Sequence, residues 1–447
     1  MSFPVLLDQT NDFLWGLMVD WVVYLGIYLT LGLQFLPLRQ LSFGIQQAWH
    51  SLRQGREATA GEGSISAFGA LMTAMAGNIG TGSVAGIALT LSIGGPGTIF
   101  WLWLVTLVGM AIKYSEAFLA VRFRSQNDRG NLVGGPMYYM CQGLPPSLRW
   151  LGLMFAGIGS LATFGLGNGV QSMELSKSLS NLVNVPPLLS GAAMAALTWL
   201  ILQGGIRRVS RVSSVLVPVM VIGYVSFTGL VLLMHLDTVP KAFAAIANDA
   251  FSGRAITGGT LLITISAGVR RALFAQESGM GTTPIVHAVA GPNDPVLQGT
   301  VAMLGNLGTA IVGTMTALVV LCSNSYLAQQ DGITMVNRAF EWGLPGSHWI
   351  SDVATLLFSF TTIIVFGYYG ERCLEYLFGS RSNQVFRLVW IAAVVLGSLE
   401  GAGWLWTTTE ALNALMALPN IIAVLMLSAL VFRTSKTYSY KAQAPGD

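Results

Sequence analysis

The chain has 447 residues, of which 53% are hydrophobic and only 10% are charged, and its formal net charge is +3. Soluble domains carry roughly 25% charged residues, so this composition excludes an ordinary soluble domain and is typical of a polytopic membrane protein. The small net charge gives no reason to expect a nucleic-acid partner. The three cysteines, Cys141, Cys322 and Cys373, have no metal or disulfide spacing.

Apolar runs of about 20 residues, the length that crosses a bilayer as a helix, recur along the whole chain. We therefore expect an all-α polytopic membrane protein with no separate soluble domain. The eleven expected spans cover residues 13–36, 66–90, 97–121, 151–178, 188–206, 212–235, 256–285, 296–322, 349–378, 385–399 and 404–432. The seventh and ninth are long, which predicts that they are bent or broken.

Positive charge is divided unequally between the two ends of these spans. Nineteen of the 23 Lys and Arg residues fall on one side, and Arg270 and Arg271 of the seventh span are counted there. Cytoplasmic loops are enriched in Lys and Arg, so this side is predicted to be cytoplasmic. Eleven crossings then place the N-terminus outside and the C-terminus in the cytoplasm, in the inner (plasma) membrane of the cell.

The long connection between the first two spans, residues 37–64, contains apolar residues at helical spacing. Ile45, Trp49 and Leu52 follow an i, i+4, i+7 pattern. This pattern is typical of an amphipathic helix that lies at the cytoplasmic membrane interface. An ordinary connecting helix would show the same spacing, and both interpretations stay open.

The second span contains the sequence Gly77-Asn78-Ile79-Gly80-Thr81-Gly82. Each interior Gly costs a helix about 1 kcal/mol relative to Ala. Unpaired backbone groups are expensive in hydrocarbon unless they line a protein cavity or bind a ligand. The sequence therefore predicts a helix break at which backbone groups meet a solute or an ion. Close helix packing by small residues is the alternative. A dinucleotide fingerprint is excluded, because no βαβ pattern surrounds these glycines.

A second candidate break lies in the seventh span, at Ser266-Ala267-Gly268-Val269-Arg270-Arg271, and continues into residues 276–284. Paired interruptions in two halves of a chain indicate an inverted-repeat transporter. We expect one transporter domain over residues 1–447. Residues 66–235 and 256–432 form its two five-helix repeats, and residues 13–36 are an additional N-terminal span.

Several polar side chains fall inside expected spans. Gln171 offers amide donors and an acceptor, either to a substrate or to a neighbouring helix, and both roles stay open. Ser359, Thr361 and Thr362 offer hydroxyl oxygens of the kind that a hard cation such as sodium prefers, although such hydroxyls also bond to the preceding helical turn.

Glu410 is the best candidate for a buried carboxylate, unless it lies at the external mouth of its span. The sequence has no Walker motif, no nucleophile elbow and no zinc spacing. It therefore predicts no enzyme and no catalytic residue.

With these residues in view, the chain resembles the alanine or glycine:cation symporter family over nearly its whole length. The stretches that carry the resemblance are Ala70-Leu71-Met72-Thr73-Ala74, Ile79-Gly80-Thr81-Gly82, Gly94-Gly95-Pro96-Gly97, Lys113-Tyr114-Ser115-Glu116-Ala117, Gly134-Gly135-Pro136-Met137-Tyr138-Tyr139, Tyr368-Tyr369-Gly370-Glu371-Arg372-Cys373 and Leu412-Asn413-Ala414-Leu415-Met416-Ala417-Leu418-Pro419-Asn420. The chain departs from the family pattern in four places: residues 275–283 differ, an aspartate expected in the eighth span is replaced around Gly308, Glu410 replaces the usual Asp, and Phe366 stands where Trp is usual.

The resemblance implies a LeuT-like fold and sodium-coupled uptake of a small neutral amino acid, such as alanine or glycine, by alternating access. It implies no organic cofactor, and no obligate protein partner is evident. The expected substrate-binding residues are Gly80, Thr81, Gly82, Gln171, Ser266, Gly268, Thr362 and Phe366, and the expected sodium ligands are Gly77, Gly80, Thr361 and Thr362. Two alternatives stay open: a proton-coupled transporter of the same fold that uses Glu410, and an amino-acid-binding sensor or channel.

Overall fold

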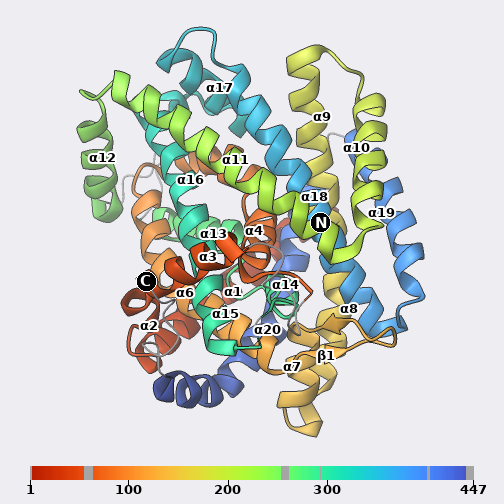
Figure 1. The fold of residues 1–447 in the computed structure, drawn as a ribbon. Helices are drawn as coiled ribbons and strands as arrows, with labels where there is room; N and C mark the ends of the chain where they lie inside the picture. The colour runs from red at the N-terminus through yellow and green to blue at the C-terminus, as the bar shows by residue number, and fades with distance from the viewer. Residues whose placement is uncertain (1–2, 55–63, 253–260, 292, 400–402, 439–447) are drawn as a thin grey trace.

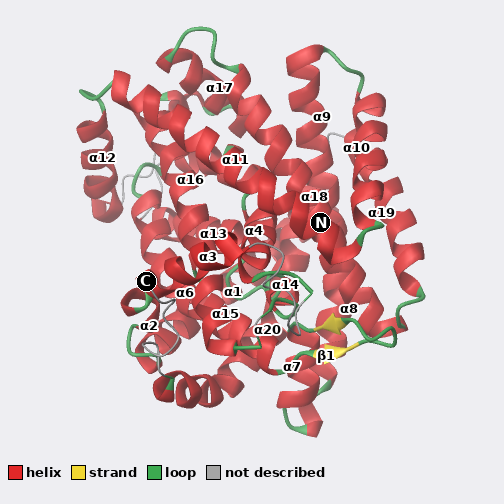
Figure 2. Ribbon diagram, in the orientation of Figure 1, coloured by secondary structure: helices red, strands yellow, loops and turns green. Residues whose placement is uncertain are grey.

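The structure, a computed structural model, describes residues 3–54, 64–252, 261–291, 293–399 and 403–438. This part of the chain is almost entirely helical (Figure 1), and its one sheet is a hairpin of β1 (Ser125–Gln126) and β2 (Leu132–Val133) (Figure 2). Within it, eight helical segments are long and apolar enough to cross a membrane. The expected all-α fold is confirmed, while the count of eleven spans and the two five-helix repeats stay predictions.

The helical elements follow the chain in this order: α1 (Phe3–Gly32), α2 (Leu36–Arg39), α3 (Leu41–Gln54), α4 (Ala67–Asn78), η2 (Thr81–Ser83), α5 (Ala85–Gly94), α6 (Thr98–Arg122), α7 (Pro136–Gly143), η3 (Pro146–Leu148), α8 (Trp150–Phe164), η4 (Gly165–Gly169), α9 (Val170–Val183), α10 (Pro187–Leu202), α11 (Gly205–Met234), α12 (Val239–Ser252), α13 (Leu261–Gln276), α14 (Pro284–His287), α15 (Pro295–Ala302), α16 (Leu304–Cys322), η5 (Ser325–Ala328), α17 (Gly332–Gly343), α18 (Trp349–Phe378), α19 (Ser382–Leu399) and α20 (Gly403–Thr437).

Each expected span contains helical structure, but several spans are divided. The second consists of α4 and α5, the fourth of α8, η4 and α9, and the eighth of α15 and α16. The ninth is the single uninterrupted helix α18, so a break expected there is wrong. The predicted amphipathic helix in the first connection exists as α3, on which Ile45, Trp49 and Leu52 are exposed.

The first predicted break is confirmed. Helix α4 ends at Asn78, and Ile79 and Gly80 leave the helical conformation before the short turn η2 and helix α5. Small residues and an Asn at this point cannot sustain the helix, whereas the apolar residues on both sides can. The break lies inside the protein, since every residue from Gly69 to Val84 is buried.

The second predicted break is wrong in its first part and confirmed in its continuation at residues 276–284. Helix α13 is continuous through Ser266 and Gly268 and ends at Gln276, so a break at Ser266–Gly268 is wrong. The chain is non-helical from residue 277 to 283, where Gly279 and Gly281 have φ of +84° and +80°. Two glycines in the left-handed region stop a helix, whereas one helical Gly can be held by packing.

That packing is visible at Gly268, which faces helix α6. A Cβ atom at this position would lie 2.4 Å from the carbonyl oxygen of Thr98. The glycine therefore allows α13 and α6 to approach each other closely, as small residues do between membrane helices.

The side assigned to Arg270 and Arg271 also needs correction. The Arg270 guanidinium lies 3.3 Å from the carboxylate of Asp12, near the N-terminal end of α1. These two arginines therefore lie toward the same side of the membrane as the N-terminus. Helix α13 ends inside the protein, so it does not carry them to the opposite side. The other seventeen residues counted on the predicted cytoplasmic side still favour the same orientation.

Helices distant in sequence lie side by side, and α1, α13, α15 and α16 pack around α6. Helix α1 packs along α20 and α6, and α10 packs along α19 (Figure 1). Every residue of α6 from Gly109 to Val121 is buried, Lys113 and Glu116 included. Charged side chains in the centre of a membrane protein must find partners there.

We predict that Gly268→Ala destabilises the protein by about 1–3 kcal/mol, because the added methyl group meets backbone atoms of α6 that cannot rotate away. Thermal unfolding in detergent, followed by tryptophan fluorescence, measures the effect. Gly223→Ala in α11 is the matched control, since a Cβ atom there meets nothing within 4 Å. Equal midpoints for the two variants would contradict the packing role of Gly268.

Candidate functional site

The two breaks meet inside the protein. The side-chain amide of Asn78, the last residue of α4, donates a hydrogen bond of 3.1 Å to the carbonyl oxygen of Gln276, the last residue of α13. Each helix end therefore supplies backbone groups to the same region. Helix ends carry unsatisfied carbonyl groups and the negative end of the helix dipole, so this region is polar although it lies deep in an apolar protein.

A small cavity of about 20 Å³ lies between the two breaks. It has room for about one water molecule. Its walls are Gly77, Asn78, Gly80, Gly82, Gln171, Phe274, Ala275, Glu277 and Thr362. Five of these residues are among those expected to bind substrate or sodium, and they come from α4, the first break, α9 and α18.

The first break presents both backbone and side-chain groups to this region. The backbone N–H of Thr81 donates to Oε1 of Gln171 at 3.4 Å. The hydroxyls of Thr81 and Ser83 are buried and have no hydrogen-bond partner among the described residues. A buried polar atom without a partner is costly, and a bound solute is one way in which such an atom is satisfied.

Gln171 is directed toward the break by an irregular helix. The π-helix η4, Gly165–Gly169, interrupts the fourth span immediately before α9. A π-helical turn changes the face on which the following residues lie, and such turns occur frequently at functional sites. Asn168 anchors this turn, because its amide donates to the carbonyl oxygen of Trp390 at 2.9 Å.

Oxygen atoms gather where α18 meets the end of α4. The Thr362 hydroxyl lies 3.0 Å from the carbonyl oxygen of Ala76 and 2.9 Å from that of Phe358. A Cβ atom at Gly80 would lie 3.0 Å from the same hydroxyl. One turn earlier, the Ser359 hydroxyl is fully buried without a partner in the described part of the chain. Hydroxyl and carbonyl oxygens without nitrogen or sulfur donors suit a hard cation such as sodium.

Two predicted residues of α18 have different surroundings. The Thr361 hydroxyl faces α11, where it lies 3.9 Å from Sδ of Met220. Phe366 is buried with its ring 5.5 Å from that of Tyr369, and its ring edge packs close to Gly77. Phe366 therefore forms an apolar wall next to the end of α4.

Ser266 and Gly268 do not reach the cavity. The Ser266 side chain is exposed and lies 3.2 Å from the carbonyl oxygen of Ile263 in its own helix, and Gly268 packs on α6. The expectation that they bind substrate is wrong, because the second break lies about ten residues further along the chain. Phe274, Ala275 and Glu277 line the cavity instead, and the residues that depart from the family pattern at 275–283 mark this position in the sequence.

A larger cleft of about 590 Å³ lies on the other side of Phe274. Its walls come from α1, α5 and α13, and its charged residues are Asp12, Asp20, Arg270 and Arg271. The Arg271 guanidinium lies 4.7 Å from the ring centre of Phe274 and packs against Gly82 and Gly86. Phe274 lines both the cleft and the small cavity, so one aromatic ring separates them.

The second break is held by a buried charged network. Nζ of Lys113 donates to the carbonyl oxygen of Glu277 at 3.0 Å and to the hydroxyl of Thr283 at 2.6 Å. Lys113 therefore joins the two ends of the non-helical segment. The carboxylate of Glu277 accepts a hydrogen bond from Thr282, and the carboxylates of Glu277 and Glu116 both attract the ammonium group.

Glu116 holds the middle of the same segment together with α20. One of its oxygens accepts hydrogen bonds from the Asn420 amide at 2.6 Å and from the backbone N–H of Gly281 at 3.2 Å. The Asn420 amide also donates to the carbonyl oxygen of Gly279, and its own oxygen accepts from Tyr139. The network thus ties the break to α6, α7 and α20.

Two further sequence predictions can be placed only in part. Glu410 lies within α20, but its side chain is outside the described residues. No group of three or more His, Cys, Asp or Glu residues that could hold a metal ion occurs in the part of the chain that was searched.

Comparisons with known proteins give a consistent result. A model of the sodium:alanine symporter family matches residues 2–446. An uncharacterized transporter of Haemophilus influenzae is 38% identical over 98% of this chain and 96% of its own length. The sodium/alanine symporter AgcS of Methanococcus maripaludis is 34% identical over 98% of each chain. The crystal structure of MhsT in complex with L-phenylalanine covers 82% of this chain and 89% of its own, with a TM-score of 0.60 at 12% identity, which shows a shared fold.

We predict that Lys113→Met lowers the free energy of unfolding by about 3–5 kcal/mol, because it leaves the carboxylates of Glu116 and Glu277 buried without their cation. The double variant Lys113→Met with Glu116→Gln should recover part of this loss. Thermal unfolding of the three proteins in detergent tests the network.

Lys177→Met is the matched control for Lys113→Met. Lys177 lies 3.2 Å from Asp331, with both side chains about half exposed, and such surface pairs contribute at most about 1 kcal/mol. If Lys113→Met is no more destabilising than Lys177→Met, or if the double variant recovers nothing, the buried network does not hold the break.

Proposed function

Because the chain belongs to the sodium:alanine symporter family, whose members are membrane transporters and not enzymes, we propose that it is a symporter that couples sodium entry to the uptake of a small neutral amino acid such as alanine or glycine. The observation that carries the proposal is the polar cavity between two helix breaks, which Gly80 and Gly82 line. The hydroxyls of Thr81 and Ser83, their neighbours in the chain, are buried without a hydrogen-bond partner among the described residues. Broken helices at mid-membrane are the typical substrate site of such transporters.

The amino acid would bind as a zwitterion between the two breaks. Its carboxylate would meet backbone N–H groups and the hydroxyl of η2, at Gly80, Thr81 and Gly82, next to the positive end of the α5 dipole. Its ammonium group would lie toward the carbonyl groups at the end of α13, near Ala275. Gln171 would fix the substrate through its amide. Phe274 lines the cavity, and the small size of the cavity favours a small side chain over a bulky one.

Sodium would bind where α18 meets the end of α4. The carbonyl groups of Gly77 and Gly80 and the hydroxyl of Thr362 are the proposed ligands, and the buried hydroxyl of Ser359 offers a further oxygen. Thr361 belonged to the predicted set, but its hydroxyl faces Met220 and gives this assignment no support. Each positive charge that enters across 100 mV supplies about 2.3 kcal/mol, which helps to accumulate a substrate without net charge.

Alternating access would connect the cavity to one side of the membrane at a time. The 590 Å³ cleft is the proposed external entrance, because it lies near the N-terminal end of α1, which we place outside. Movement of Phe274 would open the cavity to this cleft. In this proposal residues 66–235 and 256–432 form the two inverted repeats, α1 is the additional span, and the C-terminus lies in the cytoplasm of a cell whose inner membrane holds the protein.

A proton-coupled transporter of the same fold is the second candidate. It is favoured by the carboxylate of Glu116, of which Oε2 is buried and has no hydrogen-bond partner among the described residues. A buried carboxylate without full pairing is a reasonable proton carrier in a membrane protein. Here Glu116, rather than Glu410, is the carboxylate whose surroundings can be examined.

We predict that purified protein in proteoliposomes accumulates labelled alanine or glycine when an inward sodium gradient is imposed. An inward proton gradient without sodium should drive little uptake. Accumulation that depends on the proton gradient and not on sodium would replace sodium coupling with proton coupling. Specific binding without exchange against internal alanine would contradict a symporter and favour a sensor or a channel.

We predict that Gln171→Ala raises the KM for the amino acid at least about tenfold, because loss of a hydrogen bond to a charged group costs about 1.5–3 kcal/mol. Gln384→Ala is the matched control, since Gln384 is exposed and pairs only with Gln203 at 3.4 Å within the described structure. Uptake kinetics measure both variants. An unchanged KM in Gln171→Ala would remove Gln171 from the substrate site.

A further inference from the structure

A cleft of about 410 Å³ lies at the opposite end of α1 from the proposed entrance. Its walls are Gly32, Leu33, Gln34, Leu36, Arg39, Gln40, Phe432, Arg433, Ser435, Lys436 and Tyr438. It therefore joins the end of α1, the turn into α2 and the last turns of α20. This is the side of the protein that the charge distribution predicts to be cytoplasmic.

The cleft carries positive charge and no acidic residue. Arg39, Arg433 and Lys436 line it, and none of the three forms an ion pair within the described residues. The Asp294 carboxylate accepts a hydrogen bond of 2.6 Å from Tyr438, which lines the cleft, and also caps the first turn of α15. The charge of Asp294 is therefore already engaged outside the cleft.

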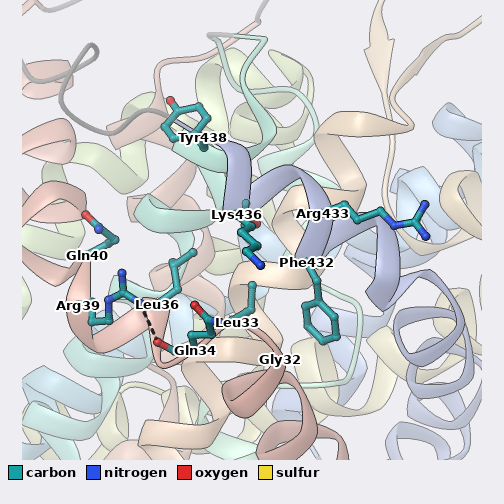
Figure 3. Close-up of a pocket in the computed structure, with 11 residues that line it drawn as sticks. Gly32, Leu33, Gln34, Leu36, Arg39, Gln40, Phe432, Arg433, Lys436 and Tyr438 are labelled. Atoms are coloured by element: carbon teal, nitrogen blue, oxygen red, sulfur yellow. Dashed lines mark hydrogen bonds between the residues drawn. The ribbon is translucent and has the colours of Figure 1, made fainter.

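The basic side chains lie on two facing walls of the cleft. Figure 3 shows Arg39 beside Gln34 on the side of α1 and α2, and Lys436 on the side of α20. The guanidinium of Arg39 donates to the carbonyl oxygen of Gln34 at 3.2 Å. Gln34 and Phe35 both have φ near +55°, so a tight left-handed turn forms this wall. Arg433 extends away from the other side chains in Figure 3, which leaves Arg39 and Lys436 as the central pair.

Apolar surface continues from the cleft toward the membrane interior. Phe35 and Leu38 beside the cleft are about half exposed, and Tyr28 and Leu31 on α1 are exposed as well. On α20, Met426 is exposed two turns before the cleft. A ligand with an anionic head and a hydrocarbon tail would contact basic residues and apolar residues at the same time.

The helix that follows the cleft in the chain has the features of a helix at the membrane surface. Helix α3 follows α2 directly and exposes Ile45, Trp49 and Leu52, and the Arg53 guanidinium lies 5.3 Å from the ring centre of Trp49. Exposed Trp and basic residues on an amphipathic helix are typical of the interface between lipid headgroups and acyl chains. The cleft next to this helix would then lie among the headgroups.

We propose that this cleft binds the phosphate headgroup of an anionic phospholipid of the cytoplasmic leaflet. Arg39 and Lys436 contact the phosphate from opposite walls, and the acyl chains lie along the exposed faces of α1 and α20. Basic pockets between membrane helices on the cytoplasmic side recognise such headgroups in this way. The bound lipid joins the additional N-terminal helix to the last helix. The proposal rests on the position of the protein in a membrane and not on the identity of its substrate.

Short-chain phosphatidylglycerol, titrated into the full-length protein in neutral detergent and followed by native mass spectrometry, tests the proposal. We expect binding that phosphatidylcholine does not reproduce. Arg39→Gln with Lys436→Gln should weaken it about 30-fold, since each basic residue contributes about 1 kcal/mol to such binding and 1.4 kcal/mol is a factor of ten. Thermal stabilisation by the lipid should fall in parallel.

Arg149→Gln with Arg381→Gln is the matched control. Both arginines are exposed and are counted on the same side of the membrane, and neither lines the cleft. This double variant should bind phosphatidylglycerol as the parent protein does. Equal weakening in the two double variants would reduce the effect to general surface charge and overturn the site. Competition by inorganic phosphate as strong as that by the lipid would overturn the assignment to a lipid.

Discussion

The hydrogen bond between the Asn78 amide and the carbonyl oxygen of Gln276 is the contact on which the rest of the structure depends. It joins the ends of two helices that stop deep inside an apolar protein. A helix that ends there leaves backbone groups without partners, which hydrocarbon does not tolerate. The protein meets this constraint by placing the two ends against each other. Residues at both helix ends line the small polar cavity between them.

The two breaks are stabilised by different means. The first is lined by small residues and unpartnered hydroxyls, and its described contacts to α9 and α18 are few. The second is held by the Lys113 ammonium, the Glu116 carboxylate and the Asn420 amide. These groups form hydrogen bonds with the backbone of Glu277, Gly281 and Gly279, respectively. The second break is therefore a fixed wall, and the first is the side that has polar groups left to offer a solute.

Helix α6 makes this arrangement possible. It is buried on all sides over more than three turns, and it carries a lysine and a glutamate into the protein centre. Buried charges are costly unless they find partners, and here the lysine and the glutamate both form hydrogen bonds to the broken chain. The same helix receives Gly268 of α13 at close range. The 590 Å³ cleft is lined in part by α13, and the basic cleft is lined in part by α20, so both adjoin helices that hold the second break.

The sequence by itself determined the class of the protein and the first break. Hydrophobic length requires membrane helices, and Gly77, Asn78 and Gly80 weaken one of them locally, so both follow from short-range physics. The tertiary structure decided which part of the second predicted break is non-helical, because Gly268 remains helical through its contact with Thr98, whereas Gly279 and Gly281 do not. It also decided the partners of Lys113 and Glu116 and the side on which Arg270 lies. Those depend on contacts between residues more than a hundred positions apart, which no local pattern encodes.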